Sequence, residues 1–400
     1  MLRDFPQLRR IAVISDFCDG VFADERTPSV EEAASAWRSG NRGPAPAGTS
    51  LVAVSPRPSV VGGYLERLPL AAVRRGLCDA AEIWSFWAKP AQPPWSLDQP
   101  TLIRRSFRTD DVLHRPFKSV DMLGYIAAFG PPDILCVWGL GVDVSILEAC
   151  ASSVRIYNSI DAPAMRVPDE VGHHFDIVLT GAQWQSEEVE RRHPGMLTAI
   201  MPIGPEFASP DTFFPLGLEK IYDVVYVAAA QAYKNHEVLF KALARLPRSM
   251  RALCVCGYGE LGEQLRARAQ ELGVSVDFVG PPGVGIEEVN RLMNQARIGV
   301  VCGVNDGAPA ILTEYMLAGL PVLANSQLTC GLQFINSATG RVADADHFPV
   351  VLQEMLADIE SFRPREAVLL DWAWTHTVER FSGLVQEARR RKADVANCPR

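Results

Sequence analysis

The chain has 400 residues, of which 48% are hydrophobic and 22% charged, and it carries a formal net charge of −8 at pH 7. This length predicts two to three domains, each able to bury a full hydrophobic core. The acidic balance disfavours nucleic acid as a partner.

The cysteines and the apolar runs indicate the compartment. Nine cysteines are scattered along the chain without a Cys-x-x-Cys pair, which favours buried thiols in a reducing compartment over a disulfide framework or a zinc site. The first residues contain no apolar core of signal-peptide length, and no run of ~18 apolar residues occurs anywhere in the sequence. We therefore expect a cytoplasmic protein without a transmembrane segment.

The N-terminal half predicts one α/β unit. Residues 11–14 and 51–54 are short apolar runs of strand type, and residues 38–50 between them are rich in Gly, Pro and Ala, which is typical of a loop. Gly62 and Gly63 open an amphipathic stretch that ends near residue 76. A strand-like run over residues 81–86 follows.

A segment rich in Pro, Phe and Gly, residues 202–218, predicts a linker between two domains. We expect an N-terminal domain over residues 1–205, a linker over 206–219, a C-terminal domain over 220–370, and a terminal helix and tail over 371–400.

Residues 298–324 carry the strongest functional pattern, a strand, a loop, a helix and a second strand. Pro309 suits the first turn of the helix, and Gly319 followed by Pro321 ends it. The loop contains Asp306 and runs directly into the helix N-terminus. In open α/β sheets, ligands bind at such places because unpaired N–H groups and the helix dipole attract phosphate.

The helix in this block is apolar around nearly its whole circumference, and Glu314 is its only charge. A buried carboxylate needs hydrogen-bond donors, and the hydroxyl groups of a ligand are candidates. The alternative is that Glu314 pairs with an arginine and that Asp306 caps the helix. The residues of the helix alone leave both interpretations open.

The block resembles the nucleotide-sugar signature of glycosyltransferase family 4, a family of retaining, group 1-type enzymes with the GT-B fold. The residues that match the signature are Glu314, Met316, Ala318, Gly319, Pro321, Val322 and Ala324. The resemblance implies two Rossmann-like α/β domains that face each other across a cleft, with a C-terminal helix that crosses back to the first domain. It also implies that Glu314 binds the donor ribose, and that Asp306, where the family has Glu, faces the transferred sugar.

Further matches keep the order of the family along the C-terminal half: residues 201–204, 223–234, 255–260, 276–280 and 371–374. By this resemblance Lys234 contacts the donor diphosphate, and Gly257 lies in a donor-binding turn. Ala229 stands where the family has an arginine, so that one expected cation is missing from the donor site.

The N-terminal half supplies fewer matches. By resemblance, Gly62 and Gly63 approach the donor phosphates and the acceptor, although an ordinary turn is the alternative for a Gly pair. Trp138 stands where the family usually has His. We assign Trp138 and Asp161 to the acceptor side.

Three other motifs indicate structure rather than chemistry. Residues 344–346 resemble a metal-binding Asp-x-Asp but are typical of a surface turn. Residues 173–174 are a His pair without further ligands at metal spacing, as expected for a helix surface or an interdomain contact. Residues 389–392 are basic, and we expect a solvated helix end, with contact to an anionic membrane as the alternative. We therefore predict no metal site.

Together these features predict a metal-independent glycosyltransferase that uses a nucleotide-diphosphate sugar and needs no cofactor, and the resemblance alone implies that the enzyme is retaining. Lys234, the N–H groups of Gly307, Ala308 and Ala310, and the turn with Pro309 would stabilise the leaving diphosphate. The acceptor would be a carbohydrate, a lipid-linked molecule or a small molecule. One alternative is a non-catalytic nucleotide-sugar-binding subunit that partners an active homologue; a hydrolase or epimerase would need a further acid in the N-terminal domain.

Overall fold

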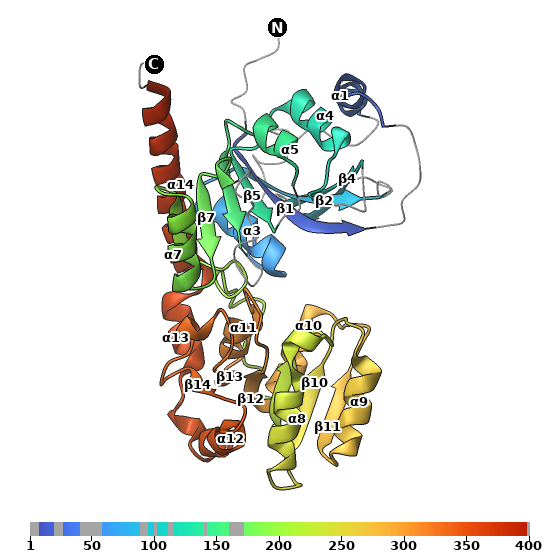
Figure 1. Cartoon of the computed structure of the whole chain (residues 1–400), viewed down its shortest axis with the longest axis vertical. Coiled ribbons are helices and arrows are strands. Elements are labelled where there is room, and N and C mark those ends of the chain that lie inside the picture. The colour runs from blue at the N-terminus through green and yellow to red at the C-terminus, as the bar shows by residue number, and fades with distance from the viewer. Residues whose placement is uncertain are drawn as a thin grey trace. The chain divides into compact units, whose positions relative to one another are not determined.

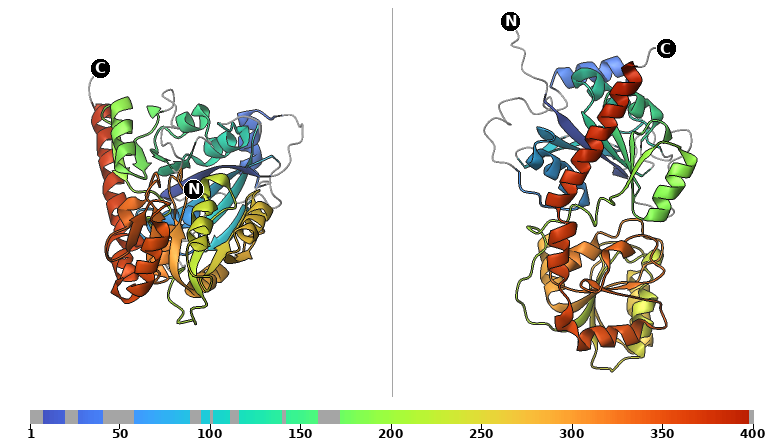
Figure 2. Two further views of the ribbon diagram at one scale, coloured as in Figure 1. Left: turned by 60° about the horizontal axis from the view of Figure 1, so that its bottom comes forward. Right: turned by 90° about the vertical axis from the view of Figure 1, so that its left-hand side faces the viewer.

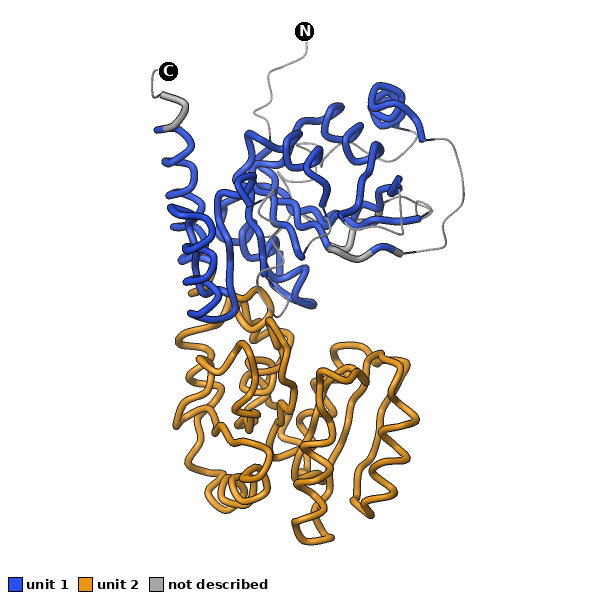
Figure 3. Tube along the Cα trace, viewed as in Figure 1, with its two compact units in different colours: residues 1–160, 164–201, 378–400 blue, residues 161–163, 202–377 orange. Residues whose placement is uncertain are grey.

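The structure, a computed structural model, describes residues 8–19, 27–40, 58–88, 95–99, 102–110, 116–139, 142–159 and 172–397. The chain forms two compact units (Figure 3). Unit 1 contains residues 1–160, 164–201 and 378–400, and unit 2 contains residues 161–163 and 202–377. The boundaries expected from the sequence, at residues 205, 219 and 370, stay a prediction.

Unit 1 is built on an eight-stranded sheet (Figure 1). In spatial order its strands are β3 (Trp95–Gln99), β4 (Leu102–Arg108), β2 (Ala80–Trp87), β1 (Arg10–Asp19), β5 (Ile134–Trp138), β6 (Val154–Asn158), β7 (Ile177–Thr180) and β8 (Leu197–Ile200). All neighbours pair in parallel except β3 and β4, which are antiparallel. The side chains of β5 are buried without alternation, as is typical of a parallel strand covered on both faces.

The helices in the described part of unit 1 are α1 (Val30–Arg38), α3 (Tyr64–Arg75), α4 (Val120–Phe129), α5 (Val144–Ala149), α7 (Gln183–Arg192) and most of α14 (Trp374–Asn397). Helix α1 was not predicted from the sequence. It begins with a capping box between Ser29 and Glu32. The Trp37 side chain of this helix is buried, and its indole N–H donates to Asp121 Oδ1 at 3.0 Å. Tertiary packing against α4 therefore supports this short helix.

Unit 2 contains a six-stranded, wholly parallel sheet. Its strands, in spatial order, are β11 (Ser275–Val279), β10 (Arg251–Val255), β9 (Tyr222–Val227), β12 (Ala296–Val301), β13 (Val322–Asn325) and β14 (Gly340–Ala343). Its helices are η1 (Ala232–Lys234), α8 (His236–Ala244), α9 (Gly262–Glu271), α10 (Ile286–Asn294), α11 (Ile311–Leu317), η2 (Leu332–Phe334), α12 (Phe348–Ala357), η3 (Ile359–Ser361) and α13 (Pro364–Asp371).

The expected fold class is confirmed: both units are α/β with parallel, Rossmann-like sheets. Residues 11–14 lie in β1 and residues 81–86 in β2. The amphipathic stretch forms α3, which ends at Gly76 in the left-handed conformation, with φ of 81°. The strand expected at residues 51–54 lies outside the described residues.

The last helix, α14, belongs to unit 1 from Val378 onward, as the expected crossing helix requires. Figure 2 shows it lying against unit 1. The basic run at its end is not simply solvated: Lys392 Nζ donates to the carbonyl oxygens of Ala151 and Ser153 and to Asp176 Oδ2, at 3.0, 2.6 and 3.0 Å. No helix among the described residues combines the length and the apolar character that crossing a membrane requires.

Candidate functional site

The strand order of unit 2 creates a switch point between β9 and β12. From β9 the chain proceeds outward to β10 and β11, then returns to β12 on the other side of β9 and continues to β13 and β14. The loops that follow β9 and β12 therefore separate in opposite directions at the carboxyl edge of the sheet. Ligands of open α/β sheets bind in the crevice that such a reversal leaves.

Lys234 and Asp306 meet at this switch point. Lys234 follows β9 and Asp306 follows β12, and the Lys234 ammonium forms an ion pair with Asp306 Oδ2. The side chains of Lys234 and Asp306 are 16% and 12% exposed, so the pair is largely desolvated but still open to solvent on one side. The ammonium keeps further N–H donors, and Asp306 keeps its second oxygen, for a ligand.

The backbone around Lys234 is held by contacts from β9 and from the loop that follows β12. The Tyr226 hydroxyl donates to the Lys234 carbonyl oxygen at 2.6 Å, and the Val304 N–H donates to the Tyr233 carbonyl oxygen at 3.1 Å. Asn235 follows in the left-handed region with φ of 49°, where the short helix η1 ends and α8 begins. The loop that presents the lysine is thus tied directly to the loop that presents Asp306.

Glu314 lies on α11, the helix that the sequence block predicted. The side chains of Leu312, Thr313, Tyr315, Met316 and Leu317 are buried, whereas Glu314 is half-buried. The helix ends as expected, because Gly319 has φ of 88° and the Leu320 N–H donates to the Tyr315 carbonyl oxygen at 2.9 Å. The Tyr315 hydroxyl joins α11 to β9 through the Val227 N–H at 2.7 Å.

The loop from Gly307 to Ala310 leads into α11. Helix α11 starts at Ile311, and the Leu312 N–H donates to the Pro309 carbonyl oxygen, so Pro309 lies in the preceding turn and not inside the helix. Gly204 packs against this loop, since a Cβ at Gly204 would lie 3.2 Å from the Ala308 carbonyl oxygen. Gly307 and Pro309 are buried, whereas Ala308 and Ala310 are half-buried.

Ala229 and Gly257 lie in the loops that follow β9 and β10. Ala229 is buried and supplies no side-chain cation. The two loops pack closely, because the Ala230 N–H donates to the Tyr258 carbonyl oxygen at 2.7 Å, and a Cβ at Gly259 would lie 2.4 Å from the Ala230 carbonyl oxygen. Gly257 has open space at its Cβ position.

Sequence reasoning missed two aromatic side chains next to the ion pair. Tyr233 lies under the Lys234 ammonium, 4.8 Å from nitrogen to ring centroid, and Tyr258 is 63% exposed. Partial desolvation raises the pKa of Tyr258, with further increases from Tyr233 and Asp306 and an opposing effect of Lys234, so Tyr258 belongs to the same site. The available signal in the sequence was that Tyr233 directly precedes Lys234 and that Tyr258 lies in the loop after β10.

Unit 1 holds the remaining candidate residues. Gly62 has φ of 100° and Gly63 is the N-cap of α3, so the Gly pair forms the turn before that helix. Trp138 ends β5, is 3% exposed, and packs its ring on that of Tyr64 at 4.8 Å. Within the described part of the chain, its indole N–H has no hydrogen-bond acceptor. Asp161 lies outside the described residues.

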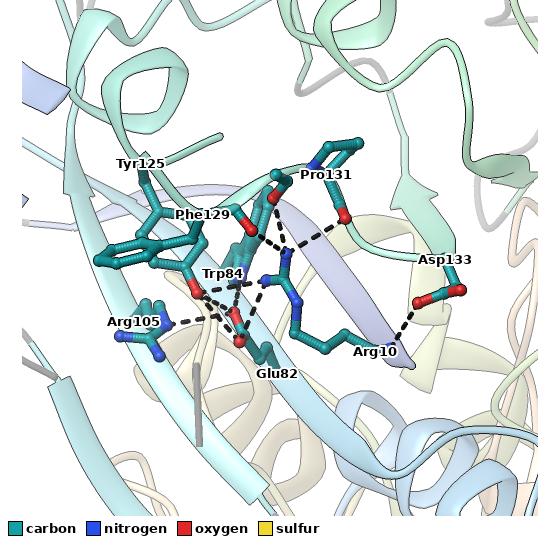
Figure 4. A network of polar contacts seen from close by, with 9 residues as sticks. Arg10, Glu82, Trp84, Arg105, Tyr125, Phe129, Pro131 and Asp133 are labelled. Carbon is teal, nitrogen blue, oxygen red and sulfur yellow. Dashed lines mark hydrogen bonds and ion pairs between the residues drawn. The ribbon is translucent and has the colours of Figure 1, made fainter. Parts of the chain in front are cut away.

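A second set of charges, drawn in Figure 4, is buried in unit 1. Glu82 is completely buried and accepts from Arg10 Nη1 at 3.4 Å and Arg105 Nε at 3.1 Å. The Trp84 indole N–H and the Tyr125 hydroxyl also donate hydrogen bonds to this carboxylate, at 2.6 and 3.0 Å. Because these four partners of the carboxylate are themselves buried, the network holds strands β1, β2 and β4 to α4.

Among the described residues, no group of three or more His, Cys, Asp or Glu side chains could hold a metal ion. Asp344 instead accepts from the N–H groups of Asp346 and His347 at 3.0 and 2.9 Å, which is the geometry of a turn before α12.

The comparisons with known proteins identify the domain that contains this ion pair. Residues 209–360, most of unit 2, match the family described as "Glycosyl transferases group 1". Over 115 residues the chain is 27% identical to GalNAc-alpha-(1->4)-GalNAc-alpha-(1->3)-diNAcBac-PP-undecaprenol alpha-1,4-N-acetyl-D-galactosaminyltransferase of Campylobacter jejuni, a match that covers 28% of this chain and 31% of that protein.

Two solved structures extend the similarity to nearly the whole chain. Sucrose-phosphate synthase from Thermosynechococcus elongatus aligns with a TM-score of 0.65 and 18% identity, over 96% of this chain and 100% of that chain. HepE of Anabaena, solved in complex with UDP and glucose, aligns with a TM-score of 0.60 and 13% identity, over 95% and 100%. At these identities the likeness establishes the GT-B fold alone.

Proposed function

We propose that this chain, whose residues 209–360 form a group 1 glycosyltransferase domain, transfers a sugar from a nucleotide-diphosphate sugar to an acceptor. The observation that carries the proposal is the ion pair between Lys234 and Asp306 at the switch point of unit 2. There the pair lies beside the loop that leads into α11 and its half-buried Glu314.

Each side chain has a role that its chemistry supports. Lys234 offers the ammonium that opposes the negative charge developing on the leaving diphosphate. Asp306 offers a carboxylate oxygen to the transferred sugar, and Glu314 accepts hydrogen bonds from the ribose hydroxyls. Tyr258, which is exposed beside the pair, offers an aromatic face to the base.

The bond changes define what the site must stabilise. The bond between the anomeric carbon and the diphosphate breaks, the acceptor oxygen bonds to the same carbon, and the acceptor proton passes to the leaving phosphate. Retention of configuration and metal independence rest on the resemblance to family 4. UDP is the first nucleotide to test as the carrier of the donor sugar, because HepE, which shares the fold, was solved with UDP and glucose.

The acceptor side is proposed for the carboxyl edge of unit 1, at the ring pair of Tyr64 and Trp138. Tyr64 is 48% exposed, so its ring can contact the apolar face of a sugar. Tyr64→Ala should raise the KM for the acceptor, whereas Tyr64→Phe, which keeps the ring, should not. Equal KM values for parent and Tyr64→Ala would reject this role.

The eight cysteines among the described residues form no disulfide. This state favours a reducing compartment, and we propose the cytoplasm as the place of action.

The decisive experiment compares binding and transfer in one variant. Asp306→Ala should still bind UDP but lose sugar transfer, because the sugar contact matters most as charge develops in the transition state. Asp358→Ala, a change of the same type at the end of α12, is the matched control and should keep both UDP binding and sugar transfer. If the parent protein binds UDP and shows neither transfer nor donor hydrolysis across a broad panel of donors and acceptors, the protein is a nucleotide-sugar-binding subunit instead.

A further inference from the structure

Unit 1 contains a cavity of about 690 Å³ that belongs to neither the donor site nor the acceptor side. It lies between the end of α14 and the edge of the sheet formed by β6, β7 and β8. Its size is within the range of small-molecule sites. The charged side chains that line it are those of Arg155, Asp176, Arg192, Arg391 and Lys392.

The cavity lies at the amino edge of the sheet. Arg155 is the second residue of β6, Asp176 directly precedes β7, and Met196 directly precedes β8. Trp138, by contrast, ends β5, whose neighbour β6 runs parallel to it. The cavity and the proposed acceptor residues therefore lie at opposite edges of one sheet.

Cationic side chains predominate among the described residues that line the cavity. Four cationic side chains, those of Arg155, Arg192, Arg391 and Lys392, line it together with one carboxylate, that of Asp176. This excess of positive charge occurs on a chain whose formal net charge is −8. Clustered cations in a protein of opposite net charge repel one another, so an anionic partner would stabilise this arrangement.

Docking of α14 explains only part of this cluster. Lys392 binds Asp176 and two carbonyl oxygens, and Arg391 Nη1 donates to the Gly195 carbonyl oxygen at 2.9 Å. Arg391 also pairs with Glu387 on α14, Nε to Oε1 at 2.8 Å, and its side chain remains 47% exposed. Arg155 Nη1 donates to the Leu147 carbonyl oxygen at 3.2 Å, and Arg155 Nε lies 3.9 Å from Asp176 Oδ2. Arg155 and Arg192, which come from the sheet edge and from α7, bring two more guanidinium groups to the same cavity.

The cavity also has an apolar wall. Phe175 and Ala388 are buried in it, and Pro194 and Met196 line the loop before β8. A small inorganic anion would leave this wall uncovered. A phosphate carried on an apolar group would match both the cationic and the apolar parts.

We propose that this cavity binds a phosphate or diphosphate group attached to a partly apolar molecule. Each guanidinium group can donate two parallel N–H hydrogen bonds to phosphate oxygens. Arg155 on β6, Arg192 on α7 and Arg391 on α14 would therefore contact the phosphate from three elements. A bound ligand would join α14 to the sheet edge and stabilise unit 1. The proposal rests on unit 1 alone and does not depend on the proposed transfer reaction.

The test uses inorganic pyrophosphate and isothermal titration calorimetry on the full chain. All variants carry Lys234→Ala, so that the donor site does not contribute the signal. Arg192→Gln and Arg391→Gln should each weaken pyrophosphate binding about tenfold or more, the effect of one hydrogen bond to a charged group. Arg390→Gln is the matched control, because Arg390 lies beside Arg391 and pairs with Glu387 as Arg391 does, but is not among the described residues that line the cavity.

A second arm identifies the source of the phosphate. Binding to vesicles of phosphatidylglycerol but not of phosphatidylcholine, lost in Arg192→Gln and Arg391→Gln, would indicate a lipid headgroup. Pyrophosphate binding without vesicle binding would indicate a phosphorylated soluble molecule. Circular dichroism checks that both variants are folded. If neither probe binds, or if both folded variants bind as tightly as the Arg390→Gln control, the proposal is wrong.

Discussion

The two units each contain a central group of charges, and the two groups differ in what surrounds them. In unit 1, Glu82 is wholly buried and all its partners are protein groups. In unit 2, Lys234 and Asp306 are largely buried but face solvent on one side, at a switch point of the sheet. Burial therefore does not distinguish the two groups; the difference is that the unit 2 pair, which we propose as the donor site, keeps charge that a ligand can reach.

The pKa of Glu82 shows how the closed network works. Burial raises the pKa of this carboxyl group, but the neighbouring guanidinium groups of Arg105 and Arg10 outweigh burial and hold the pKa below its usual value. The group thus stays ionised and structural. The comparison predicts that changes in unit 1 act on stability and that changes at the unit 2 pair act on ligand binding.

The largest expected effect is on unit 1. Glu82→Gln would leave Arg10 and Arg105 buried without a carboxylate, which should destabilise the protein by about 3 to 5 kcal/mol. Urea unfolding followed by tryptophan fluorescence measures this, since the Trp84 indole binds Glu82. Glu379→Gln, which breaks an exposed pair with Arg75, is the control and should have little effect. If Glu82→Gln is as stable as the parent protein, the predicted structural role of the unit 1 network is wrong.

The same network predicts a pH dependence. Because the folded pKa of Glu82 is lowered, its stabilising contribution is complete above the ordinary Glu pKa of about 4.3 and is lost as pH falls through the folded pKa. Unfolding midpoints of the parent should therefore decrease with acidification more steeply than those of Glu82→Gln. Parallel pH profiles of the two proteins would show that the carboxylate does not stabilise the fold through its charge.

Lys234→Ala should act on binding with little loss of stability. Affinity for UDP should fall by about 1.5 to 3 kcal/mol, the range for hydrogen bonds to charged groups, whereas affinity for uridine should remain. Calorimetry with both ligands measures the difference. Lys241→Ala, which removes an exposed lysine of α8, is the matched control. Equal losses for both ligands would mean that Lys234 supports the loop and does not address phosphate.

Glu314→Gln should have a smaller effect on the same affinity. The amide keeps a neutral acceptor for the ribose hydroxyls, so the loss of uridine and UDP affinity should be about 1.5 kcal/mol. Unchanged affinity for both ligands in a folded variant would reject the ribose role and favour the structural interpretation of this carboxylate.

The smallest effect concerns the support of the Lys234 loop. Tyr226→Phe removes the hydrogen bond to the Lys234 carbonyl oxygen and should weaken UDP binding by about 1 kcal/mol. Tyr222→Phe removes a hydroxyl that binds Asp277 at the protein surface and serves as the control. If both variants bind UDP like the parent, the loop is held by its other contacts.

Local rules were sufficient for many elements. Gly76 and Gly319 end α3 and α11 because only glycine adopts a left-handed conformation without strain, and both ends were predicted from the sequence. The apolar runs in β1 and β2 and the buried helix around Glu314 follow from periodicity. The sequence and its family resemblance also indicate Lys234 and Asp306 as candidate residues of the donor site.

The tertiary structure decided which of these side chains meet. Lys234 and Asp306 are 72 residues apart, and their contact exists because β9 and β12 are neighbours in the sheet, which no local pattern specifies. Likewise, Lys392 holds α14 to unit 1 because the packing of this helix places its ammonium next to Asp176. The sequence by itself determined the elements and the chemistry at their ends; strand order and helix docking, which depend on long-range packing, determined the pairs.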